Sequence, residues 1–385
     1  MTMDDLNHSI HLIPDDGTYT PINKGQFTLE TPDREAEFDK KRGFGVENDY
    51  LENRRQWSEY PRQQHVSNYP LHVDIELASL CNLHCPMCYT ITPEFKEKVH
   101  AKLMDYDLFT KLVDECSAGG VYSIRLSFRG ESFLHKRIID CVRYAKQKGI
   151  KEVSTLTNGL KLDENMFKEI MEAGIDWITI SFDGLNETYE QIRRPAKYER
   201  AVEKIKNYQQ IKKEAGRVKP LIKVQTILPA IEKDPQAFYD VFAPITDMVS
   251  SNPLIDFMQD KASLPKIPNF TCPQIYQRLT IGADGTCMMC ANDETNEHVV
   301  GNVNIQTIHE VWHGQEMSRV RELHNQHKGC EALGPCNRCY LPLATYEDKV
   351  SLGDRYVIAE KYLSGVEKVS DLNTPENFKR SEMDV

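Results

Sequence analysis

Three closely spaced cysteines are the feature of this sequence that most clearly indicates chemistry. The segment reads Cys81-Asn-Leu-His-Cys85-Pro-Met-Cys88. Four cysteine thiolates normally hold a [4Fe–4S] cluster, so three local thiolates would leave one iron open to a small molecule. A zinc site is the alternative, but zinc prefers four ligands with paired spacing, and the fourth ligand available nearby is His84.

Six of the eleven cysteines form a second group, between Cys272 and Cys339. In a reducing compartment, clustered cysteines indicate metal binding rather than disulfides. The pairs Cys287/Cys290 and Cys336/Cys339 could form a zinc ribbon, although the segment between the pairs is long for one. The isolated Cys116 and Cys141 fall on apolar helix stripes, and we predict that both are core residues.

Charge and hydropathy exclude several classes of protein. The net charge of -11 disfavours a nucleic-acid partner, because phosphate binding needs a concentrated positive field. No apolar run reaches the roughly 18 residues of a membrane span. The N-terminus lacks the basic and apolar stretches of a secretion signal. We therefore expect a cytoplasmic protein with neither a membrane nor a nucleic-acid partner.

Alternating strands and helices are predicted to position the first cysteine group. Apolar and polar residues alternate over 71–77, 122–128, 178–182 and 222–228, which indicates strands. The helical stretches between them end at glycines, which is typical of helix C-termini. This order of elements predicts a parallel α/β unit.

The predicted strands keep one polar face, which is unusual for strands covered on both sides. Its members are His72, Asp74, Glu76, Arg125, Ser127, Thr179, Ser181, Lys223 and Gln225. A closed eight-stranded barrel would fill its lumen with branched apolar side chains. We therefore expect an incomplete barrel that holds a polar substrate in its lumen.

The chain divides into four predicted regions. They are an N-terminal extension without strong periodicity (1–70), the barrel (71–265), the second cysteine module (266–345) and a C-terminal tail (346–385) that ends in about 20 polar residues. The module is predicted to contain a hairpin over 279–287 and a helix over 307–324.

The motif CxxxCxxC, placed after the first strand of an α/β unit, resembles the signature of the radical S-adenosylmethionine (SAM) superfamily. The resemblance implies an incomplete (β/α)6 TIM-like barrel. It also implies a [4Fe–4S] cluster on Cys81, Cys85 and Cys88, whose open iron binds the amino and carboxylate groups of SAM. Reductive cleavage of SAM would then give a 5′-deoxyadenosyl radical that abstracts hydrogen from the substrate. A flavodoxin or ferredoxin would supply the electrons.

Other positions resemble the SAM-binding residues of this family. In Arg129-Gly130-Glu131-Ser132, the central pair matches a Gly-Gly-Glu-Pro-like stretch and the flanking residues depart from it. The match implies that Glu131 pairs with the SAM ammonium. Met87 stands where an aromatic residue often contacts adenine. The remaining implied SAM contacts are Asn158, Ser181, Asp183 and Arg194, for each of which a turn or a surface charge is the alternative.

The second cysteine group resembles the auxiliary-cluster modules of the SPASM and shorter twitch types. The resemblance implies one auxiliary [4Fe–4S] cluster, and its implied ligands are Cys272, Cys290, Cys336 and Cys339. Cys330 is the main rival for a place in this set. Cys287 is left over, either as a core thiol or as a catalytic hydrogen donor.

These inferences converge on a hypothesis about the reaction. A fully ligated auxiliary cluster can pass electrons but cannot bind substrate. Together with a polar lumen, such a cluster indicates a radical SAM oxidoreductase of dehydrogenase or epimerase type. Its substrate would be a sugar-like molecule or a nucleotide-linked sugar. A peptide-modifying enzyme is the first alternative. A zinc-stabilised interaction protein without catalysis is the second.

Overall fold

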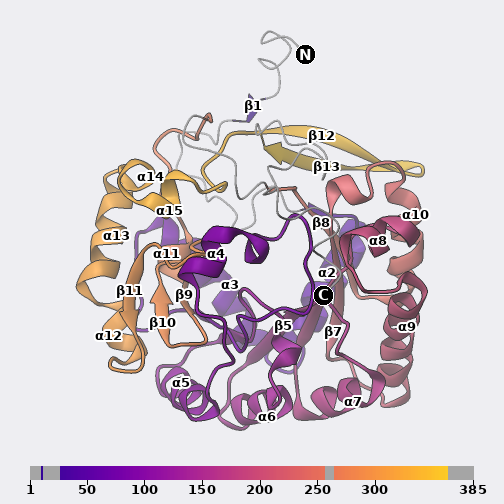
Figure 1. The fold of residues 1–385 in the computed structure, drawn as a ribbon, viewed down its shortest axis with the longest axis horizontal. Coiled ribbons are helices and arrows are strands. Elements are labelled where there is room, and N and C mark those ends of the chain that lie inside the picture. The colour runs from indigo at the N-terminus through magenta and orange to yellow at the C-terminus, as the bar shows by residue number, and fades with distance from the viewer. Residues whose placement is uncertain (1–9, 12–26, 256–263, 363–385) are drawn as a thin grey trace.

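The computed structural model describes residues 10–11, 27–255 and 264–362 (Figure 1). Six strands form its centre: β3 (His72–Ile75), β4 (Ser123–Arg125), β5 (Glu152–Thr157), β6 (Trp177–Ser181), β7 (Leu221–Ile227) and β8 (Met248–Asn252). The main helices between them are α5 (Tyr106–Ala118), α6 (Ile138–Gln147), α7 (Glu164–Ala173), α8 (Asn186–Ile192), α9 (Tyr198–Glu214) and α10 (Pro235–Phe242). Figure 1 shows α5, α6, α7, α9 and α10 as an outer ring around the strands.

The six central strands are parallel and neighbour one another in chain order. The sheet continues beyond β3 through β9 (Arg278–Ile281), β10 (Thr286–Met288) and β11 (Val299–Asn302). At its other edge β2 (Phe27–Thr28) pairs antiparallel with β8. The expected incomplete (β/α)6 barrel is confirmed, and the predicted hairpin over 279–287 is present as β9 and β10.

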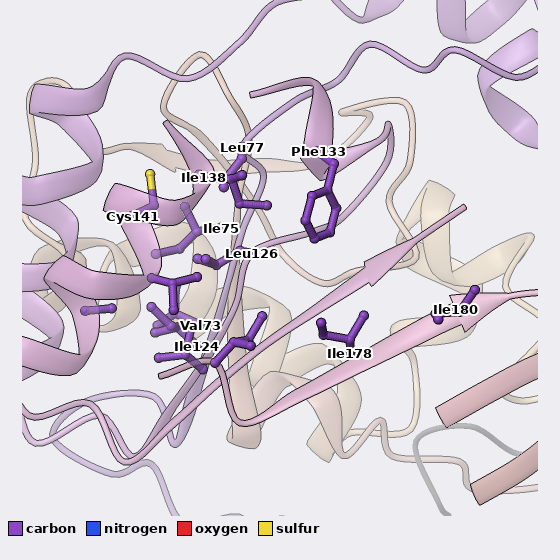
Figure 2. Close-up of a cluster of buried hydrophobic side chains, with 14 of the residues drawn as sticks. Val73, Ile75, Leu77, Ile124, Leu126, Phe133, Ile138, Cys141, Ile178 and Ile180 are labelled. Carbon is purple, nitrogen blue, oxygen red and sulfur yellow. The ribbon is translucent and has the colours of Figure 1, made fainter. Parts of the chain in front are cut away.

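The apolar faces of the strands lie under the helices, as expected. Figure 2 shows Val73 and Ile75 of β3, Ile124 of β4 and Ile178 of β6 in one buried cluster. Cys141 of α6 belongs to the same core and is fully buried, as is Cys116 of α5, which confirms that both are core thiols. Because side chains alternate along a strand, the polar residues point into the lumen.

Two helices that the sequence analysis did not predict lie in the N-terminal region. They are α2 (Pro32–Gly43), capped by the Thr31 side chain, and α3 (Glu47–Arg62). Phe38 of α2 packs edge-on against Trp177, the first residue of β6, with ring centroids 6.0 Å apart. Trp57 of α3 packs against His72, the first residue of β3. The two helices therefore close the N-terminal end of the barrel, whereas residues 1–9 and 12–26 lie outside the described part.

The second cysteine module contains four short helices and one longer helix. They are α11 (Gln274–Gln277), α12 (Ile308–Trp312), α14 (Gly329–Ala332), α15 (Gly334–Asn337) and the longer α13 (Gln315–Asn325). The single helix predicted over 307–324 is wrong, because the chain breaks at Gly314 between α12 and α13. A Cβ at Gly314 would stand 2.9 Å from the Glu310 carbonyl oxygen, so the tight break requires glycine.

A hairpin occupies the start of the predicted C-terminal tail. Its strands are β12 (Thr345–Leu352) and β13 (Arg355–Tyr362), and β12 also pairs with β1 (Ile10–His11). Figure 1 shows the hairpin along the edge of the ring, between α14 and α10. The predicted polar end of the tail lies outside the described residues. No helix of the described part is long and apolar enough to cross a membrane.

Candidate active site

The first cysteine motif lies in the loop between β3 and α4 (Pro93–Lys98), at the C-terminal mouth of the barrel. Cys85 is buried and Cys81 and Cys88 are half-buried, whereas His84 is exposed. Burial raises the pKa of Cys85 to about 12 and that of Cys81 to about 11. Thiols in such surroundings become thiolates when a metal cation binds them, so this donor set fits the expected iron cluster.

Gly130 lets the cysteine loop pass directly over β4. A Cβ at Gly130 would overlap the Leu80 carbonyl oxygen and stand 2.6 Å from the Ala78 carbonyl oxygen. The next residue donates its backbone N–H to the same Leu80 oxygen, at 2.7 Å. The match at Gly130 therefore has a steric cause.

Replacing Gly130 by alanine is expected to displace the cysteine loop. About four of the roughly eight irons per chain should then be lost, together with SAM cleavage. Iron analysis and a 5′-deoxyadenosine assay measure both effects. Gly120→Ala is the control, because its Cβ meets nothing within 4 Å and only its φ of +71° is strained. Full iron in Gly130→Ala would contradict the steric argument.

Glu131 is buried beside the cysteine loop, where three protein donors orient its carboxylate. Oε1 accepts from the Thr157 hydroxyl (2.7 Å) and the Phe133 N–H (3.0 Å), and Oε2 accepts from the Asn158 N–H (2.7 Å). Burial raises the pKa of Glu131, and these hydrogen bonds oppose that shift. The carboxylate still has lone pairs free for a ligand ammonium.

The other predicted SAM contacts lie at the same mouth. The Asn158 amide donates to Asn82 at 2.8 Å and lies 3.9 Å from the Cys81 sulfur. Ser181 is buried on β6, where it is in register with Gln225 of β7. Met87 is half-buried within the cysteine loop.

An arginine adjacent to the predicted one reaches the cysteine loop. Arg193 binds Asp183 through a pair of contacts of 2.6 and 2.5 Å. Its charge also acts on Cys85 and on Glu131. Arg194, the predicted residue, is half-buried and precedes Pro195. The spacing in Ile-Arg-Arg-Pro could not distinguish the two, because only tertiary packing determines which side chain turns inward.

Arg129 connects the barrel to the second cysteine module, a role that the sequence did not suggest. Its guanidinium binds the Glu76 carboxylate through two contacts, of 2.7 and 2.6 Å, and both side chains are almost fully buried. The remaining amino group donates to the Glu294 carbonyl oxygen (3.2 Å) and the Asn296 side chain (2.8 Å). The arginine that stands here in place of the first glycine of the Gly-Gly-Glu-Pro-like stretch therefore supplies a contact between the two domains.

Five cysteines line one small cavity in the C-terminal module. They are Cys272, Cys290, Cys330, Cys336 and Cys339. Burial raises the pKa of Cys272 to about 12, and the charge of the neighbouring Cys339 adds to this shift. In the described chain no three His, Cys, Asp or Glu side chains are spaced as the ligands of a single metal ion. A cubane separates its thiolates further, because each of them binds a different iron.

Hydrogen-bond donors surround these sulfurs. The Asn292 backbone N–H points to Cys290, and the Asn292 amide and the Leu341 N–H point to Cys339, each at 3.4 Å. His324 Nε2 lies 3.4 Å from the Cys336 sulfur. Donors aimed at cysteine sulfurs stabilise thiolates and tune an iron–sulfur cluster, so the cavity fits the expected auxiliary cluster.

Cys287 lies apart from both groups of cysteines. Its side chain is completely buried in the main apolar core, so it reaches neither the solvent nor the lumen. Burial raises its pKa to about 12, and Glu115 of the surrounding helix α5 is among the charges that act on it. This position favours packing over hydrogen donation as the role of Cys287.

Cys287→Ala should lower the free energy of unfolding by about 1–2 kcal/mol through lost packing. Iron content and product should remain those of the wild type. A thermal unfolding scan and product analysis, with Cys116→Ala as a matched core control, measure these effects. A variant that unfolds normally yet forms a different stereoisomer would restore the donor role.

Comparisons with known proteins agree with this geometry. A family model described as the radical SAM superfamily matches residues 75–223, and one described as an iron–sulfur cluster-binding domain (SPASM) matches residues 272–340. The first range contains the cysteine loop and Glu131. The second contains the five cysteines of the C-terminal cavity.

Curated relatives match a part of the chain. A tungsten-containing aldehyde ferredoxin oxidoreductase cofactor-modifying protein of Pyrococcus furiosus is 34% identical over 157 residues, which cover 40% of this chain and 42% of that protein. A probable GTP 3′,8-cyclase of Methanococcus maripaludis is 32% identical over 112 residues, or 29% and 36% of the two chains. The matched segments thus span about two fifths of these relatives.

Solved structures share the fold over most of the chain. BtrN in complex with AdoMet and 2-DOIA has a TM-score of 0.50 and 17% identity, and the match covers 71% of this chain and 94% of BtrN. Streptococcus suis SuiB bound to its precursor peptide SuiA has a TM-score of 0.50 and 13% identity, covering 77% and 78%. At these identities the likeness concerns the fold alone.

Proposed function

Because the chain belongs to the radical SAM superfamily and carries a C-terminal SPASM iron–sulfur domain, we propose that it oxidises a polar small molecule in the barrel lumen. Bound SAM and its reduced cluster supply the species that abstracts hydrogen. In this proposal Cys81, Cys85 and Cys88 hold that cluster, and Glu131 receives the SAM ammonium. Arg193 replaces Arg194 as the cation of the site, because its charge reaches Cys85.

The observation that carries the proposal is a polar lumen that is closed at one end. Arg42 of α2 enters from the N-terminal end, where it binds Glu152 at 2.6 Å and stacks over Trp177. The cysteine loop lies at the opposite mouth. A substrate must therefore fit between Arg42 at the closed end and the cysteine loop at the open mouth. This favours a small hydroxylated molecule over a peptide that runs through the barrel.

The positions of the thiols favour oxidation over epimerisation. Epimerisation by a cysteine needs a thiol in the lumen to return hydrogen to the substrate. All eleven cysteines lie in described parts of the chain, and eight of them belong to the cysteine loop or the C-terminal cavity. The other three, Cys116, Cys141 and Cys287, are fully buried in the core. Oxidation needs no such donor.

The balance of the proposed oxidation is simple. A carbinol carbon loses one hydrogen atom to the species derived from SAM, and its hydroxyl loses a proton to solvent or to a basic side chain. The remaining electron would be accepted by an auxiliary cluster held by Cys272, Cys290, Cys336 and Cys339, and the substrate would leave as a carbonyl compound. An external flavodoxin- or ferredoxin-type protein exchanges electrons with the clusters.

Deuterium transfer tests the substrate class. Cells grown in deuterated medium provide a low-molecular-mass fraction and a peptide fraction, which are supplied separately to the reduced protein and unlabelled SAM. We expect deuterium in 5′-deoxyadenosine with the first fraction. Transfer from the peptide fraction alone would support the peptide-modifying alternative, and the structural neighbour SuiB is bound to a precursor peptide. Absence of 5′-deoxyadenosine would contradict radical SAM activity altogether.

A pair of single substitutions tests the auxiliary ligand set, for which we propose Cys272, Cys290, Cys336 and Cys339. Cys336 is buried and its sulfur lies near His324, whereas Cys330 is half-buried at the cavity edge. Cys336→Ala should lose about four irons per chain. Cys330→Ala should retain them. Iron and sulfide analysis measures both, and the reverse result would place Cys330 in the ligand set.

A further inference from the structure

The middle of the lumen carries charges that the proposed chemistry does not use. Ile222 and Val224 of β7 face the apolar core, so Lys223 between them faces the lumen. Arg125 of β4 faces the same space, since Ile124 beside it lies in the core. Strand register runs from Arg125 through Ser154 and Trp177 to Leu221, which places Lys223 one inward-facing layer above Arg125.

The carboxylates of this region are already paired. Asp74 is shared between Arg125 at 2.8 Å and Arg278 at 3.1 Å. Glu152 is bound by Arg42 of α2. His72, next to Asp74, adds no further positive charge, because burial lowers its pKa to about 4 and leaves it neutral. The two carboxylates, Asp74 and Glu152, are therefore outnumbered by three arginines even without Lys223. The arginines are Arg42, Arg125 and Arg278.

Lys223 has no counter-ion among the described residues. Only 9% of the residue is exposed, and no hydrogen bond or ion pair engages its ammonium group there. Burial, with a contribution from the Arg42 charge, lowers its pKa to about 8, so the amine is still largely protonated at neutral pH. Arg125 keeps 31% of its side chain exposed to the lumen and can accept a second partner.

The Glu76–Arg129 pair nearer the mouth is balanced and leaves this sum unchanged. Among these described residues, three arginines and Lys223 face two carboxylates, which is an excess of two positive charges inside a protein whose net charge is -11. Burying cations without counter-charges is unfavourable, so an empty lumen or a neutral ligand would leave these cations uncompensated. A ligand with two negative charges would remove the penalty.

We infer that the substrate carries a dianionic group, a phosphate or a pair of carboxylates, which binds between Lys223 and Arg125. This inference rests on the proposed function, since it takes the lumen as the substrate site. It narrows the substrate from any polar small molecule to a phosphorylated or multiply acidic one. The charged group would be held deep in the lumen, and the carbon to be oxidised would face the cysteine loop.

Lysine labelling tests the anion site without knowledge of the substrate. Pyridoxal 5′-phosphate carries both an amine-reactive aldehyde and a phosphate, and pyridoxal is the matched reagent without the phosphate. The anaerobic holoprotein is treated with each, the imine is trapped with cyanoborohydride, and labelled peptides are quantified. Lys219, which pairs with Asp176 outside the lumen, is the internal reference.

We expect Lys223 to be labelled about tenfold more by the phosphorylated reagent, the factor typical of one charge-assisted contact. Inorganic pyrophosphate or succinate should suppress this labelling, whereas glucose should not. Suppression by pyrophosphate alone assigns a phosphate, and suppression by both assigns a general dianion site. Equal labelling by the two reagents, or labelling that neither dianion suppresses, would overturn the inference.

A parallel assay separates failure of this inference from failure of the proposed function. Wild-type holoprotein is tested for 5′-deoxyadenosine formation from SAM in the same preparation. SAM cleavage with unselective labelling contradicts the anion site and leaves the radical function standing. Selective, suppressible labelling without SAM cleavage supports the anion site and contradicts the radical function. Lys223→Met should abolish the selective label while Lys219 labelling is unchanged.

Discussion

Changing Cys81, Cys85 and Cys88 together to alanine should lower the iron content from about eight to about four atoms per chain and abolish SAM cleavage. The reason is that these three thiols share one loop, and their burial makes thiolate formation depend on bound iron. The C-terminal cavity, with its own five cysteines, should keep its cluster. Iron, sulfide and zinc analysis after anaerobic reconstitution, with a 5′-deoxyadenosine assay, measures the outcome.

The control for this experiment changes two cysteines outside both groups. Cys116→Ala combined with Cys141→Ala removes thiols that lie in the apolar core, so the iron content should remain at its wild-type value. Retention of about eight irons in the triple variant would contradict the assignment of the first cluster. A fall from four irons to none, with one zinc retained, would show that the C-terminal module holds zinc, and the auxiliary electron acceptor would be lost from the proposal.

Arg129→Leu should be among the most destabilising single substitutions in the barrel. It leaves Glu76 buried and unpaired, and removal of one partner of a buried ion pair typically costs about 3–5 kcal/mol. It also removes both contacts with the Glu294–Asn296 segment of the C-terminal module. The unfolding midpoint of the anaerobic holoprotein and the electron paramagnetic resonance signal of the auxiliary cluster should both change.

The double variant Arg129→Leu/Glu76→Leu distinguishes ion pairing from simple loss of packing. Replacing both charges by apolar groups removes the unpaired carboxylate, so much of the stability should return. The altered cluster signal should persist, because the contacts between the domains are still missing. Arg143, which is half-exposed and pairs with Asp140, is the control whose change to leucine should leave the midpoint in place. A double variant as unstable as Arg129→Leu alone would contradict this account.

Local patterns predicted much of the barrel. Alternation with a period of two placed four of its strands, because each strand must hide one face under helices and expose the other to the lumen. The same alternation identified Lys223 and Arg125 as polar strand residues before their surroundings were known. The spacing of Cys81, Cys85 and Cys88 predicted one cluster site, whereas the resemblance of the second cysteine group to SPASM-type modules implied the other.

Long-range packing was beyond the reach of such patterns. Helices α2 and α3 are largely polar and pack on the barrel through single aromatic residues such as Phe38 and Trp57. Their sequences therefore contain no apolar stripe that would predict a helix. The same limit applies to Arg193 and Arg194, whose local sequence is equivalent until the fold turns one of them toward Asp183.

The sequence by itself predicted the class of chemistry, because three cysteines in one loop can hold a cluster with an open iron and their spacing resembles the radical SAM motif. It also determined the two-faced strands that make a polar lumen. Only the tertiary structure showed that Cys287 is buried in the core, that Arg129 joins the two domains, and that Lys223 has no counter-ion among the described residues. The physical reason is that burial and charge balance are sums over segments distant in the chain, as when Asp74 meets Arg278 across 204 positions.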